Sequence, residues 1–144
     1  MPPTMTWPTP NDYCAAVQNP QHCFSADELR GGSIVRDMLG LPKVSSGNFA
    51  VVFELEQGRQ RYAVKCFTRQ IRDQQQRYAA ITRYLAGRRL PVLVSFRYFP
   101  EGIRLAGDLF PLLTMEWIAG ELLHQCVERR LGTPALLREL AEQW

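Results

Sequence analysis

Two short stretches carry residues that could bind a nucleotide phosphate. The first, "KVSSGNFAVVFEL", has one glycine, Gly47, before a run of β-branched and aromatic residues. Glycine has no Cβ, so backbone N–H groups can approach phosphate oxygens closely. The second, "RYAVKCF", places Lys65 among apolar neighbours, where an ammonium group needs an anionic partner because desolvating an isolated charge is costly. Taken alone, the loop could equally be a hairpin turn, and Lys65 could reach solvent from a strand edge.

A third stretch, "TMEWIAGEL" from Thr114 to Leu122, follows the first two in a fixed order. Together they resemble the small lobe of the protein kinase family, in particular bacterial Ser/Thr protein kinases. That family opens with a loop of the form G-x-G-x-x-G-x-V, continues with a lysine in an A-x-K strand, and packs a helix against the sheet. Its fifth strand leads into a hinge often written MEY, followed after a few residues by glycine. The likeness covers about residues 41–123.

The resemblance implies an ATP site with a role for each matching position. Lys65, the one catalytic residue, would bind the α- and β-phosphates. The Glu116 carbonyl would accept a hydrogen bond from the adenine amino group, and the Ile118 N–H would donate to a ring nitrogen. The implied loop residues are Val44 before the loop, Ser45, Gly47 and Ala50 at its glycine positions, Phe49 at its tip and Val52 above the base. The remaining ones are Ala63 beside Lys65, Met115 as the gatekeeper, and Glu116, Trp117 and Ile118 as the hinge.

The chain departs from the family pattern in three places. Two loop glycines are replaced, by Ser45 and Ala50, which narrows the conformations open to the loop. No glutamate occurs between Cys66 and Pro100, so the partner of Lys65 is left open: Asp73, an acid elsewhere, or only the nucleotide. The catalytic H-R-D-x-x-x-x-N and the metal-binding D-F-G are missing, since no aspartate follows Asp108. We therefore expect this chain alone to be inactive and to be the front part of a larger kinase-like protein.

The elements that would position these residues form an α+β arrangement. For residues 41–118, the pattern predicts a five-stranded antiparallel sheet with one packed helix. Its first strands are "KVSS", "AVVFEL" and "RYAVKCF", with a turn at Gly58. The helix, "IRDQQQRYAAITRYLAG", would begin at Ile71 and end at Gly87, with Tyr78, Ile81 and Leu85 on its apolar face. The stretches "LPVLVSFRYF", "GIRLAG" and "LFPLLTMEWI" look like further strands, either three or two of which one is split by a turn.

The two ends of the chain flank this small lobe. Residues 1–40 are expected to be an irregular extension with one short helix, capped by Ser25 with Glu28 three residues on. Residues 119–144 are expected to be two helices broken at "GTP", with Thr133 as N-cap, resembling the start of a truncated large lobe. The last helix carries an apolar stripe that needs a partner, either a protein or the missing large lobe. The stripe consists of Leu136, Leu137, Leu140 and Trp144.

Composition and charge narrow the class of protein. With 46% hydrophobic and 22% charged residues, the 144-residue chain fits one ordinary domain. The start has no signal-peptide pattern and no apolar run approaches membrane length, so we expect a cytoplasmic protein with no membrane partner. The four cysteines show no CxxC pair and are expected to be reduced thiols, with no metal site. Residues 58–97 hold ten of the 17 basic residues and one acid, so they carry a local charge of +9.

Three functions compete on these grounds. We expect an ATP-binding small lobe of a Ser/Thr protein-kinase-like protein, with Mg²⁺ bound only if a complete large lobe is present. The alternative is a pseudokinase or protein-interaction module without catalysis. A nucleic-acid binder is the reading we favour least, because its arginines match no recognised motif and could equally form a solvated face. It would use Arg69, Arg72, Arg77, Arg83, Arg88 and Arg89, with Tyr78 and Tyr84 as stacking residues.

Overall fold

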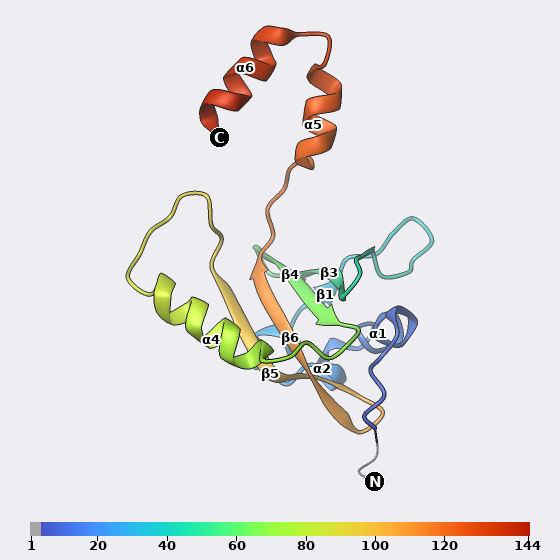
Figure 1. Ribbon diagram of the computed structural model, residues 1–144. Coiled ribbons are helices and arrows are strands. Elements are labelled where there is room, and N and C mark those ends of the chain that lie inside the picture. The colour runs from blue at the N-terminus through green and yellow to red at the C-terminus, as the bar shows by residue number, and fades with distance from the viewer. Residues whose placement is uncertain (1–3) are drawn as a thin grey trace.

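A six-stranded, open antiparallel sheet forms the centre of the computed structural model, which describes residues 4–144 (Figure 1). The strand order is β1–β3–β4–β6–β5, and β2 also pairs with β3. The α+β class is confirmed, and residues 41–118 contribute the five strands expected for them, while β1, which precedes that range, adds a sixth strand of two residues at the edge of β3. The strands are β1 (Ser33–Ile34), β2 (Val44–Ser46), β3 (Ala50–Gln57), β4 (Gln60–Phe67), β5 (Phe96–Leu105) and β6 (Asp108–Glu116).

The β3–β4 hairpin forms as the sequence predicts. Its turn contains Gly58 at φ 61°, a left-handed conformation that glycine adopts without steric cost. Val64 and Cys66 are fully buried on one face of β4, whereas Lys65 lies on the other, as the alternation of a strand requires.

β5 and β6 occupy this region, and β5 joins two of the expected stretches, which agrees with the alternative of one strand interrupted by a turn. Residues 90–95 form no strand, and β5 runs unbroken in the chain from Phe96 to Leu105. Its pairing with β6 is irregular between Phe99 and Ile103, at the "PEG" stretch where a turn is expected from sequence. Proline and glycine there distort the ladder without ending the strand.

Helix α4 (Gln74–Leu85) packs along one side of the sheet beside β5 (Figure 1). It begins three residues later than expected, and Gly87 at φ 75° follows its end as expected. Tyr78 stacks on Tyr98 with ring centroids 4.9 Å apart and meets Phe96 at 5.7 Å. Burial raises the pKa of both tyrosine hydroxyls. Because Tyr78 belongs to this packed cluster, a nucleic acid base could stack on it only by displacing it.

The N-terminal region is more ordered than the irregular extension expected for residues 1–40, of which 1–3 lie outside the described residues. It forms three short helices, α1 (Pro10–Ala16), α2 (Pro20–Cys23) and α3 (Asp27–Arg30). Tyr13, Val17, Phe24 and Leu29 are at most 1% exposed and pack against β3, β4 and β6. The Tyr13 hydroxyl donates to the Phe67 carbonyl at 2.6 Å. These helices therefore supply part of the core on the sheet face opposite to Lys65.

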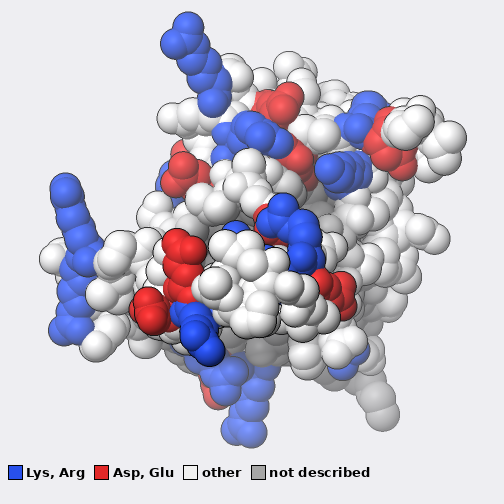
Figure 2. Space-filling model, turned by 90° about the horizontal axis from the view of Figure 1, so that it is seen from above, with Lys and Arg blue, Asp and Glu red and all other residues white. Residues whose placement is uncertain are grey.

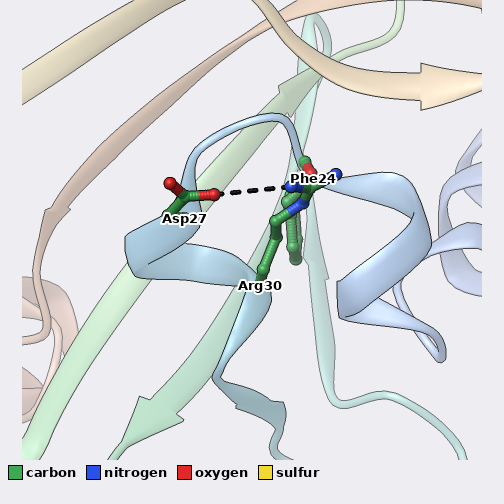
Figure 3. Close-up of polar contacts among 3 residues, drawn as sticks. All are labelled: Phe24, Asp27 and Arg30. Carbon is green, nitrogen blue, oxygen red and sulfur yellow. Dashed lines mark hydrogen bonds and ion pairs between the residues drawn. The ribbon is translucent and has the colours of Figure 1, made fainter.

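The cap expected at Ser25 is wrong. The Ser25 hydroxyl donates to the Glu101 carbonyl at 2.7 Å, and Ala26 takes the N-cap position of α3. The N-terminal end of α3 is held instead by the Arg30 side chain, which contacts Phe24 before the helix and Asp27 in its first turn (Figure 3). Its Nε donates to the Phe24 carbonyl at 3.0 Å, and its Nη1 lies 3.4 Å from Asp27.

Two C-terminal helices stand away from the sheet on a single extended segment (Figure 1). They are α5 (Leu123–Arg130) and α6 (Pro134–Gln143), broken where the sequence predicts, and they bury no residue. Thr133 occupies the N-cap position but its side chain makes no capping bond. Of the predicted apolar stripe, Leu136 is exposed and Trp144 is 93% exposed.

The charged surface is mixed in sign. Viewed from above, basic and acidic side chains are interspersed (Figure 2). Arg61 and Arg97, from the basic stretch, pair with Glu54 and Glu28. The local excess of basic residues is therefore partly balanced by acids elsewhere in the fold. None of the helices in residues 4–144 has the length and apolar character needed to cross a bilayer.

Candidate nucleotide-binding face

Strand register brings five of the predicted site residues onto one face of the sheet. Ser45 pairs with Val52, and Val52 pairs with Lys65, so the three form a row across β2, β3 and β4. Ala63 pairs with Met115 in the next row, one pleat away. We call this surface the Lys65 face. Val52 has an even number and the other four have odd numbers. They still share a face, because the pairing register between antiparallel strands decides which residues lie side by side.

Other predicted residues lie at the margins of this face or off it. Val44 pairs with Phe53, whose side chain is in the opposite core, so alternation puts Val44 on that other face. Phe49 is half exposed at the tip of the β2–β3 turn, with the Arg69 guanidinium 4.8 Å from its ring centroid. Glu116 is exposed at the end of β6, and Ile118 is 62% exposed beyond it.

Gly47 lies in the turn between β2 and β3. Its N–H donates to the Ala50 carbonyl at 2.9 Å, so in this conformation the loop is a closed hairpin turn. The fold does not require glycine there: a Cβ would meet only the Ala50 oxygen, at 3.7 Å, and φ is not left-handed. The space beside Gly47 is therefore open.

Lys65 has no acidic partner within 4 Å among residues 4–144. The residue is partly buried, and its Nζ lies 5.6 Å from the centroid of the Phe67 ring. Asp73, one partner considered from sequence, precedes α4 and lies 3.7 Å from Arg72 instead. The helix position facing the sheet is taken by Tyr78, so α4 offers Lys65 no carboxylate.

Sequence reasoning missed Glu54, the one buried acid described on the Lys65 face. It pairs with Ala63, is 3% exposed, and binds the Arg61 guanidinium. Arg61 also lies over the Trp117 ring at 5.9 Å, and its carbonyl accepts from the Trp117 N–H at 3.0 Å. Strand alternation could have placed Glu54 beside Lys65, but nothing in the sequence indicated its burial. Glu54 and Arg61 therefore hold Trp117, the first residue after β6, against the sheet.

Two cavities border the segment from Glu116 to Ile118 rather than the row of Ser45, Val52 and Lys65. One of about 750 Å³ lies between Glu116, Ile118 and the α4–β5 loop, where Arg88 and Arg89 line it. Another, of about 500 Å³, is formed by Arg61, Trp117 and neighbouring residues of the β3–β4 turn. A further cavity of about 990 Å³ lies between the N-terminal segment and the β5–β6 turn.

No three His, Cys, Asp or Glu side chains within residues 4–144 gather into a group that could hold a metal ion. Comparison with known proteins adds no family, since neither a protein-family model, nor a curated protein, nor a solved structure matches the chain. The chemistry of the site therefore has to be argued from its own residues.

Proposed function

We propose that residues 41–118 are the ATP-binding small lobe of a Ser/Thr protein-kinase-like protein. The observation that carries the proposal is the register that gathers Ser45, Val52, Ala63, Lys65 and Met115 onto one sheet face. Val52 and Ala63 would contact the base, and Lys65 would bind the phosphates. The hinge from Glu116 to Ile118, with Trp117 between them, would meet the adenine edge through backbone groups.

The unpartnered state of Lys65 supports this role. A partly buried lysine with no carboxylate within 4 Å can gain from an anionic ligand, because charge-assisted hydrogen bonds are the strong ones. The open space at Gly47 is consistent with a phosphate nearby, provided that the Gly47–Ala50 hydrogen bond opens on binding.

Phosphoryl transfer needs more than this chain supplies. An acid must position the acceptor hydroxyl and further ligands must hold Mg²⁺ against the phosphates. We propose that a complete large lobe would provide both, and that the chain alone binds ATP without transferring phosphate, in the cytoplasm.

A pseudokinase or interaction module is the second candidate. It is favoured by the apolar stripe at the C-terminus, of which Leu136 and Trp144 are exposed and no member is fully buried, and by the absence of an acid on α4 opposite Lys65. In this reading α5 and α6 dock on a protein partner or on a large lobe.

Calorimetric titration with ATP distinguishes an ATP-binding small lobe from an interaction module that binds no nucleotide. We expect binding by the unaltered chain, and Lys65→Ala should weaken it by roughly tenfold or more because a charge-assisted contact is lost. Lys43→Ala is the matched control, since Lys43 is the chain's other lysine and lies exposed before β2. Unchanged affinity of Lys65→Ala would count against the lysine role, and no binding by any form would leave only the interaction module.

A further inference from the structure

Arg69 is a second cation beside the β2–β3 turn. It lies two residues beyond the end of β4, four residues after Lys65, and it is exposed. The centre of its guanidinium lies 4.8 Å from the centroid of the Phe49 ring, at the tip of the turn. Like Lys65, it makes no ion pair with an acid among residues 4–144. Its positive charge is therefore uncompensated next to the loop that would cover the phosphates.

Backbone pairing ties the segment that carries Arg69 to this turn. The β3–β4 ladder ends in the pair of Ala50 with Phe67. One step further, the Thr68 N–H donates to the Phe49 carbonyl at 2.8 Å. The backbone next to Arg69 is thus held at the turn, whereas its guanidinium is held only by the exposed ring of Phe49. Such an exposed cation–π contact is weak, so the guanidinium can exchange the ring for a stronger anionic ligand.

The order of the residues along β4 places Arg69 further from the proposed hinge than Lys65. At the hinge end of the strand, Tyr62 pairs with Glu116. Lys65 comes next, with its Nζ 5.6 Å from the Phe67 ring, and Arg69 comes after Phe67. With adenine at the proposed hinge, the phosphates of a bound nucleotide would therefore pass Lys65 first and reach Arg69 last.

We propose that Arg69 binds the terminal phosphate of the nucleotide and makes the site selective for a nucleoside triphosphate over a diphosphate. This inference rests on the proposed ATP-binding function. The planar guanidinium can donate two parallel hydrogen bonds to phosphate oxygens, which makes arginine well suited to this contact. A diphosphate held by its base and by Lys65 ends short of Arg69, so only the triphosphate gains the second cation.

Calorimetric titration of the full chain with ATP and with ADP tests the proposal, without Mg²⁺ and at constant ionic strength. We expect the unaltered chain to bind ATP more tightly than ADP. Arg69→Gln should weaken ATP binding about tenfold or more and ADP binding less than about twofold, because only the contact to the third phosphate is lost. Arg69→Lys should keep part of the preference, since it retains the charge but not the planar fork.

Arg138→Gln is the matched control. It removes the same charge from α6, which stands away from the sheet, and it should change neither affinity (Figure 1). Equal effects of Arg69→Gln on ATP and ADP, or no effect on either, would overturn the role of Arg69 and leave ATP binding itself intact.

Inorganic tripolyphosphate distinguishes failure of the proposed function from failure of this inference. If ATP binds no more tightly than tripolyphosphate and Arg69→Gln weakens both, adenine contributes nothing. The ATP-binding function then fails, whereas the contact of Arg69 with a terminal phosphate is supported. If neither ATP nor tripolyphosphate binds the unaltered chain, both proposals are wrong.

Discussion

At the scale of single residues, the Glu54–Arg61 pair explains how the segment after β6 is held against the sheet. Glu54 is 3% exposed and would be an uncompensated buried charge without Arg61, whose side chain is 44% exposed. Because Arg61 also contacts Trp117, one cation links the sheet face to the segment after β6.

We predict that Arg61→Met lowers the free energy of unfolding by about 2 kcal/mol, because breaking a buried pair strands one charge. Urea denaturation measures the change. Adding Glu54→Gln in the same chain should restore most of the loss, whereas Arg59→Met, on an exposed turn residue, should cost little. If the double variant is as unstable as Arg61→Met alone, the Arg61 side chain stabilises the fold through packing and not by neutralising the Glu54 charge.

Buried thiols predict how stability depends on pH. Burial raises the pKa of Cys23 to about 12 and also raises the pKa of Cys66 well above its ordinary value of 9.0. Above pH 9 the unfolded chain loses these protons while the folded chain keeps them, so stability present below pH 9 is lost as pH rises toward 12.

Each buried thiol should contribute a loss of about 1.4 kcal/mol per pH unit in this range. Urea denaturation between pH 8 and pH 11 checks the slope, and Cys23→Ala should reduce it, with Cys126→Ala as the less buried control. Stability that stays constant through this range would contradict the burial of both thiols.

At the scale of elements, local patterns determined what the sequence could predict. The β3–β4 hairpin, the alternation around Lys65 and the end of α4 at Gly87 were predictable because each depends on neighbours in the chain. Helices α1 and α2 were missed, although Thr9 and Pro10 carry the start signal of α1, where Thr9 and Asp12 form a capping box. At the candidate site, the row of Ser45, Val52 and Lys65 was predictable. The pairing of Glu54 with Arg61 and the position of α4 were not, because both depend on tertiary packing.

The irregularity in β5 depends on Gly102. A Cβ at this position would lie 2.4 Å from Leu112 Cγ and 2.8 Å from Phe99 Cβ, so no side chain fits without movement of the core. We predict that Gly102→Ala destabilises the fold by about 1–3 kcal/mol through overpacking. Gly120→Ala is the control, because a Cβ there would meet nothing within 4 Å. Thermal denaturation compares the two, and equal midpoints would show that β5 adjusts freely.

At the scale of the whole molecule, the two ends of the chain differ in what they contribute. Tyr13, Val17, Phe24 and Leu29 lie in the core, whereas α5 and α6 bury no residue. The sheet is therefore covered by the N-terminal helices on one face and by α4 on part of the other.

Two truncations test this difference. Deleting residues 1–31 should prevent stable folding, since it removes several fully buried side chains, each contributing about 1.5–3 kcal/mol. Deleting residues 122–144 should leave the melting temperature almost unchanged and should reduce binding of a hydrophobic dye. A large drop in melting temperature for the second deletion would show that α5 and α6 pack on the sheet in solution.

The central claim is that the Lys65 face binds ATP, and mapping ATP onto the chain by amide NMR tests it most directly. We predict saturable shifts at Gly47, Val52, Lys65 and the hinge residues from Glu116 to Ile118. Shifts confined to residues away from the Lys65 face, or no shift at all, would contradict the account.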